Sequence, residues 1–234
     1  MSTADDTSRE NRLRRITSPL RRHRGLSLIL LTFVALTLVW ILLIPPYENL
    51  DELEHAEVVR HIVITGRLPL HGEAEANGFR VRQEASQPPL YYVLAAVWSR
   101  VLNLPQEPHN PAAVPGKVQA CGPTGTLHNK RTLEHDPYGE DATLQGTVLT
   151  IRSLRVFSML LQVLTLVGAW VLARRGFPTG PIPLFTTSLI AFNPQFLLLS
   201  AGVNNDNAVI PIATWGLVLG FDLWNKEHLT WQRS

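Results

Sequence analysis

The feature that most constrains this 234-residue chain is a run of twenty uncharged residues, 25–44, followed directly by an acidic cluster. As a helix, about twenty residues rise roughly 30 Å, which is the thickness of the hydrocarbon core of a bilayer. Pro45 and Pro46 end this run, because proline cannot continue the hydrogen-bond ladder of a helix. The next residues include Glu48, Asp51, Glu52, Glu54, His55 and Glu57. Acids are costly so close to a membrane, which makes this cluster a functional hypothesis.

Composition and charge support a membrane protein rather than one or two soluble domains. Hydrophobic residues make up 45% of the chain, charged residues only 17%, and the apolar residues come in blocks. Residues 1–24 are rich in Ser, Thr and Arg, and they are predicted to form a disordered tail. Arginines beside a first span predict a cytoplasmic N-terminus. Nucleic-acid binding is not expected, because the tail lacks interleaved aromatic residues and a folded scaffold. The single cysteine excludes an intramolecular disulfide.

The long polar region 45–149 is predicted to be one extracytoplasmic loop. It carries two predicted juxtamembrane helices, at about 50–65 and 88–104, and an irregular stretch at 105–149. The second helix is too short to cross, because only fifteen residues separate Glu84 from Arg100. With 88–104 on the surface, Arg174 and Arg175 fall on the cytoplasmic side, as the positive-inside rule favours.

Three further spans follow, which gives four in total. They are predicted at 150–173, 181–200 and 208–224, with a short outer loop at 201–207 and a cytoplasmic tail at 225–234. Asn193 and Pro194 interrupt the third span and predict a kink or a packed position. The predicted fold class is therefore all-α. The chain would be a multipass protein of the plasma membrane with a large first extracytoplasmic loop that carries juxtamembrane helices.

This topology brings acids from two outer loops to the same side of the membrane. Asp206 lies outside with Asp51 and Glu52. Asp51 and His55 are four residues apart, so on a helix they share a face, where His55 would either orient Asp51 or ligate a divalent metal ion with it. A structural zinc domain is not expected, because the histidines of the loop match no zinc-ligand spacing.

Several short motifs occur in a fixed order along the chain. P-x-x-x-x-x-D-E-x-x-H begins at Pro45, and G-R-L-P begins at Gly66. Q-P-P-L-Y-Y begins at Gln87, R-x-x-R-x-x-S begins at Arg152, and N-N-D begins at Asn204. Over residues 26–225 this order resembles the GT-C class of membrane glycosyltransferases. The resemblance is to the bacterial branch related to protein O-mannosyltransferases and lipid A aminoarabinose transferases.

The resemblance implies transfer of a sugar from a polyprenyl-phosphate carrier to an acceptor outside the membrane. Asp51 and Glu52 match the acidic position of the family's first outer loop, which acts as general base or metal ligand, and Asp206 matches the acid of the second loop. The implied substrate-binding residues are His55, Arg67, Gln87, Tyr91, Asn204 and Asn205. Many relatives have Glu-Lys before the first proline of the Q-P-P stretch, whereas this chain has Ser86-Gln87, with Glu84 two residues earlier.

The chemistry of such a transfer leaves alternatives open at this stage. A carboxylate must take a proton from the acceptor, and a divalent metal or an arginine must help the phosphate to leave. The sequence cannot choose among Arg60, Arg67, Arg80, Arg82, Arg152 and Arg155. Family members have more than four spans, so this chain would be a truncated form, a fragment or one half of a split enzyme. The rival interpretation is a non-catalytic multipass membrane subunit.

Overall fold

The computed structural model describes residues 24–49, 51–107 and 145–231, with side chains as far as Asn225. Outside these ranges lie most of the predicted N-terminal tail, most of the irregular stretch at 105–149, and the last three residues. The described helices are α2 (Arg24–Leu43), α3 (Glu52–Thr65), α4 (Glu73–Ala76), the 3-10 helix η1 (Arg82–Ser86), α5 (Leu90–Val101), α6 (Gly146–Gly176), α7 (Ile182–Ala191), α8 (Pro194–Ser200) and α9 (Asp206–Trp231). The described ranges contain no strand, which confirms the all-α prediction.

Three of these helices, α2, α6 and α9, are long and apolar enough to cross a membrane. Helices α7 and α8 are bent by 63° at a short break, and as one broken span they make a fourth. The break lies at Asn193, whose side-chain Oδ1 accepts hydrogen bonds from the N–H groups of Gln195 and Phe196. Pro194 then begins α8, where its missing N–H costs nothing. The predicted kink is therefore present at Asn193-Pro194.

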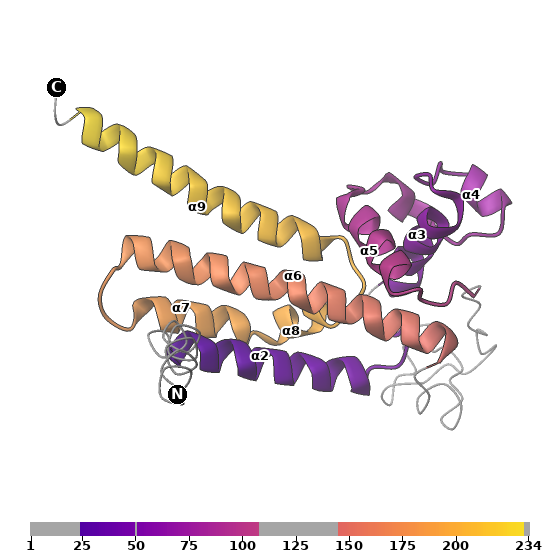
Figure 1. The fold of residues 1–234 in the computed structure, drawn as a ribbon, viewed down its shortest axis with the longest axis horizontal. Helices are drawn as coiled ribbons and strands as arrows, with labels where there is room; N and C mark the ends of the chain where they lie inside the picture. Colours follow the sequence, from indigo (N-terminus) through magenta and orange to yellow (C-terminus); the bar gives the residue numbers. More distant parts are fainter. Residues whose placement is uncertain (1–23, 50, 108–144, 232–234) are drawn as a thin grey trace, which may run out of the picture.

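Helix α6 is the central element of the bundle and contacts α2, α7 and α9 (Figure 1). Phe33 of α2, Leu166 of α6 and Ala191 of α7 are buried in one apolar core between them. Gly168 lets α9 approach α6 closely, because a Cβ atom there would lie 2.9 Å from Cγ2 of Thr214. The far half of α9 diverges from the other long helices (Figure 1).

The short helices α3, α4, η1 and α5 form a lobe at one end of the bundle (Figure 1). Helix α5 has 12 residues, a rise of about 18 Å, which is shorter than the hydrocarbon core. It packs on α3 and α6 through a core that includes Tyr91, Tyr92 and Ile151. Arg100 of α5 donates hydrogen bonds to the carbonyls of Ile62 and Val63, near the end of α3. The lobe therefore has an apolar core of its own that continues onto α6.

Candidate functional site

A buried ion pair between Glu52 of α3 and Arg155 of α6 joins the lobe to the bundle. The Arg155 guanidinium donates Nε–H to Oε1 of Glu52 at 2.8 Å and Nη2–H to Oε2 at 2.6 Å, and both side chains are fully buried. The backbone N–H of Val203 donates to Oε1 at 3.1 Å, and that of Tyr47 donates to Oε2 at 2.9 Å. We call these four residues the anchoring cluster.

The remaining donors of Arg155 are also satisfied. Its Nη1 donates to the carbonyl oxygens of Ile41 and Ile44, and its Nη2 also donates to that of Pro45. These carbonyls belong to the end of α2, where helical partners run out. A buried charge is tolerated only when its hydrogen bonds are complete, and here both partners meet that condition. Glu52 therefore holds α2, α3, α6 and the α8–α9 turn together, and its four donors leave its carboxylate no open side for a substrate.

Asp51, the neighbour of Glu52, lies on the surface. Its backbone is left-handed, with φ +47°, so it precedes α3 rather than forming part of it. Aspartate and asparagine adopt this conformation more readily than most residues. The exposed Asp51 lines a pocket of about 260 Å³ with Glu54, Arg82, Gln83 and Glu84. We call this the acidic pocket.

Arg82 is the only cation that lines the acidic pocket among the described residues. Its Nη1 lies 3.1 Å from Oε1 of Glu54, and about half of its side chain is exposed. Arg60, by contrast, pairs with Glu57 and stacks over Phe79, and Arg155 is buried. Arg82 is therefore the arginine best placed to meet an anionic group that enters beside Asp51.

Glu84 is a buried carboxylate at the edge of this pocket. Its Oε1 accepts a hydrogen bond from Gln83, while its buried Oε2 has no partner among the described residues. Burial raises the pKa of Glu84, and the negative charges of Glu54 and Asp51 raise it further. The acidic pocket thus contains a carboxyl group whose charge is poorly compensated.

His55 of α3 bonds to helix α5. The imidazole is buried, and its Nδ1 lies 2.8 Å from the hydroxyl oxygen of Tyr92, which reaches Oε1 of Gln87 at 3.5 Å. Burial lowers the pKa of His55 to about 4, against the opposing effect of the charges on Asp51, Asp206 and Glu52. His55 is therefore neutral at neutral pH and acts as a hydrogen-bonding group rather than a cation.

Asp206 begins α9, and its carboxylate is exposed. Its negative charge raises the pKa of both His55 of α3 and Tyr92 of α5, against the larger effect of burial on His55. The backbone N–H of Asp206 is held at 2.8 Å by the side-chain oxygen of Asn204. The N–H of Val203 donates to Glu52, so the segments that carry Asp51 and Asp206, far apart in the sequence, lie next to each other.

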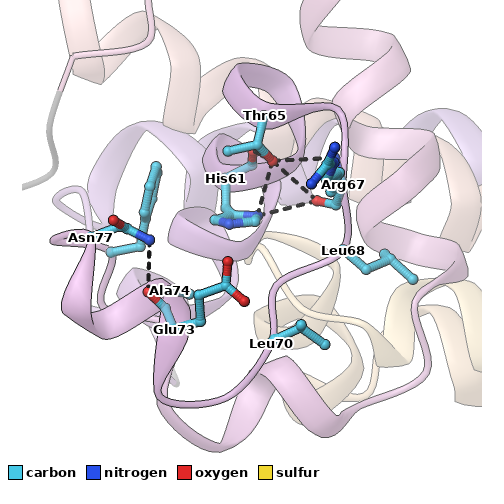
Figure 2. Close-up of a pocket in the computed structure, with 9 residues that line it drawn as sticks. His61, Thr65, Arg67, Leu68, Leu70, Glu73, Ala74 and Asn77 are labelled. Carbon is cyan, nitrogen blue, oxygen red and sulfur yellow. Dashed lines mark hydrogen bonds between the residues drawn. The ribbon is translucent and has the colours of Figure 1, made fainter.

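The other predicted substrate-binding residues are distributed differently. Tyr91 and Asn205 are buried, and the Tyr91 hydroxyl lies 2.8 Å from Oγ of Ser158, so both contribute to packing. Arg67 lies at the far end of α3 in a separate pocket of about 390 Å³, which shares no lining residue with the acidic pocket (Figure 2). There His61 bonds through its Nδ1 to the carbonyl oxygen of Arg67 at 3.1 Å.

The predicted metal pair of Asp51 and His55 stays a prediction. Nδ1 of His55 bonds to Tyr92, so Nε2 is the ring nitrogen left for a metal ion, and Asp51 is exposed whereas His55 is buried. Across the described part of the chain, no group of three or more His, Cys, Asp or Glu side chains is arranged to hold a metal ion. The acidic pocket supplies carboxylates of the type that hard cations prefer, but not gathered around one point.

Sequence reasoning did not identify Tyr92 as a site residue or Arg155 as the partner of Glu52. Tyr91 and Tyr92 are adjacent on α5 and point in different directions, so only the docking of α5 decides which one meets His55. From the sequence alone, Arg155 was one of six arginines that could each have met the phosphate. Its complete burial is the signal that separates it from the others.

No protein-family model matches this chain, and the comparisons with curated proteins and with solved structures also found no match.

Proposed function

We propose that these helices form the N-terminal part of a glycosyltransferase that uses a polyprenyl-phosphate-linked sugar at the outer face of the plasma membrane. The observation that carries the proposal is the bond from the N–H of Val203 to Glu52, which brings the segments that carry two exposed acids, Asp51 and Asp206, together at the lobe end of an apolar helical bundle. The order of motifs that resembles the GT-C class supplies the reaction type.

In this proposal Asp51 is the general base. Its carboxylate takes the proton of an acceptor hydroxyl, the hydroxyl oxygen bonds to the anomeric carbon of the sugar, and the bond from that carbon to the phosphate oxygen breaks. The polyprenyl phosphate leaves with the electron pair, and Arg82 faces the charge that develops on it. No step of this proposal is routed through a metal ion, and a divalent ion held by Asp51 and His55 stays a prediction.

The remaining residues position the reacting groups. Asp206 is the second acid and orients the acceptor from the start of α9, with Asn204 holding its backbone. His55, Tyr92 and Gln87 form a hydrogen-bonded line behind Asp51. Glu52 stays in the anchoring cluster and takes no proton.

The proposed topology has four spans and a cytoplasmic N-terminus. Arg24, which begins α2, and Arg174 and Arg175, which end α6, lie at the end of the bundle opposite the lobe, as the positive-inside rule favours for a cytoplasmic end (Figure 1). Reporter fusions after residue 130 should report an outer location. A cytoplasmic signal there would contradict this topology.

The test is transfer of labelled sugar from a polyprenyl-phosphate donor in membranes that contain a complete enzyme with this segment. Asp51→Asn should lower the rate by roughly 10²–10⁴, because it removes a positioned base while keeping a residue that tolerates the left-handed backbone. Glu73→Gln is the matched control, since it also neutralises an exposed acid of the lobe, away from the acidic pocket, and should keep the full rate. If Asp51→Asn and Asp206→Asn both retained full activity, the catalytic role of this face would be excluded.

The rival function is a non-catalytic membrane subunit, and the burial of Glu52 is the observation that favours it. Glu52, one of the two acids of the D-E motif, is bonded to Arg155 and Val203 in the anchoring cluster and is not available for catalysis. Under this rival, a complete protein that contains this segment would transfer no sugar from any polyprenyl-phosphate donor, with or without Asp51.

A further inference from the structure

Helices α2, α6 and α7 meet at the end of the bundle opposite the lobe (Figure 1), and a third pocket lies between them. Its volume is about 130 Å³, roughly the space of four water molecules. Arg24 and Gly25 line it from α2, Trp170 and Arg174 from α6, Gly180 from the turn before α7, and Leu184 from the first turn of α7. We call it the arginine pocket.

The positive charge of this pocket is uncompensated among the described residues. Arg24 and Arg174 come from different helices, no acidic side chain lines the pocket, and neither arginine has an ion pair within the described ranges. The neighbouring Arg175 differs, because its guanidinium pairs with Asp222 of α9 at 2.5 Å. Two cations therefore face one small cavity, while the cation beside them is neutralised.

The shape of the pocket is fixed by close packing. A Cβ atom on Gly25 would lie 2.7 Å from Cδ1 of Leu184, so the glycine lets α2 and α7 approach each other. The guanidinium of Arg174 lies 5.7 Å from the centroid of the Trp170 ring, a cation–π distance that helps to hold it in place. The first turn of α7 adds the partial positive charge of a helix N-terminus.

We propose that the arginine pocket binds the phosphate group of an anionic phospholipid. Basic pockets between membrane helices are suited to such headgroups. A lipid fits better than a soluble anion, because the outer surface of α7 beside the pocket carries the exposed apolar side chains Ile182, Leu184 and Phe185, along which acyl chains can lie. This inference depends on the helices crossing a membrane but not on the glycosyltransferase proposal.

The test uses the full chain purified in a neutral detergent, with thermal unfolding followed as phosphatidylglycerol is added. We expect phosphatidylglycerol to raise the Tm, and phosphatidylcholine with the same acyl chains to raise it much less. The variant Arg24→Gln/Arg174→Gln should need about tenfold or more phosphatidylglycerol for the same rise. Arg175→Gln is the matched control and should respond as the wild type does, because Asp222 already neutralises that arginine.

Native mass spectrometry gives a second readout that does not depend on unfolding. Wild-type protein should retain phosphatidylglycerol in preference to phosphatidylcholine, and Arg174→Lys, which keeps the charge, should retain more of it than Arg174→Gln. Equal retention of both lipids, or an unchanged response in the double variant, would overturn the proposal. An equal rise in Tm with millimolar inorganic phosphate alone would overturn the proposal of a lipid ligand and would indicate a site for simple anions.

Discussion

Asp51 and Glu52 are adjacent in the sequence and occupy opposite environments. Glu52 is fully buried, paired in two bonds with Arg155 and bonded by two backbone N–H groups. Asp51 is exposed, sits in a left-handed turn, and has no capping hydrogen bond from its side chain. The left-handed backbone at Asp51 therefore leaves one acid facing solvent while the next acid, Glu52, lies in the core.

This difference shows how one short motif can serve two purposes. The anchoring cluster ties the end of α2, the start of α3 and the α8–α9 turn to α6. These are the segments that carry Asp51 and Asp206, so the buried pair determines where the exposed acids lie. Stability and proposed chemistry thus fall on neighbouring residues, and substitutions can separate them.

The largest expected effect is that of Glu52→Gln on stability. The substitution leaves the buried Arg155 charge uncompensated and puts an amide where a guanidinium needs an acceptor, which should cost about 3–5 kcal/mol in the free energy of unfolding. Denaturant unfolding in detergent micelles would measure it. Asp222→Asn is the control, because its pair with Arg175 is about one-third exposed and should cost within about 1 kcal/mol. A wild-type unfolding midpoint for Glu52→Gln would contradict the anchoring role.

The second effect concerns His55 and pH. The pKa of this buried imidazole is about 4 in the folded chain and 6.5 in the unfolded chain. The unfolded chain therefore takes up the proton first, so stability falls as pH drops below 6.5 and continues to fall until about pH 4. At 1.36 kcal/mol per pKa unit, the loss from pH 7 to pH 5 should be about 2 kcal/mol.

The control for this pH dependence is a matched pair of histidine substitutions. His55→Gln should remove that part of the stability loss between pH 7 and pH 5, whereas His71→Gln, at an exposed histidine of the same lobe, should leave it unchanged. Equal pH profiles for wild type and His55→Gln would show that His55 is not held neutral by burial.

A smaller effect of opposite sign is expected for Glu84→Gln. Glu84 is buried as Glu52 is, but it lacks a cation and leaves Oε2 without a partner among the described residues. Its raised pKa means that the folded chain favours the protonated form, so ionisation costs stability as pH rises above 4.5. Glu84→Gln should raise stability by about 1 kcal/mol at pH 7, with the gain fading toward pH 4.5. A loss of stability at pH 7 would reveal a stabilising partner for the charge.

The bundle was largely predictable from the sequence, because the long apolar blocks and the Asn193-Pro194 break are local signals. The start of α3 was not, since the left-handed turn at Asp51 delays the helix to Glu52. The site was predictable only in part. The segments that carry Asp51 and Asp206 meet, but the choice of Arg155 over other arginines depends on a contact between residues far apart in the sequence. A single sequence carries no local signal for such a contact.

The smallest expected effect is that of Asp51→Asn on stability, and it completes the comparison with Glu52. Asparagine adopts a left-handed backbone about as readily as aspartate, and the exposed side chain makes no cap, so unfolding should change by at most about 0.5 kcal/mol. Asp51→Ala should cost more, about 1 kcal/mol, because alanine is disfavoured at φ +47°. The measurement is the same denaturant titration used for Glu52→Gln. If Asp51→Asn unfolded as easily as Glu52→Gln, the charge at position 51 would also anchor the fold, and a loss of sugar transfer in that variant could no longer be assigned to chemistry.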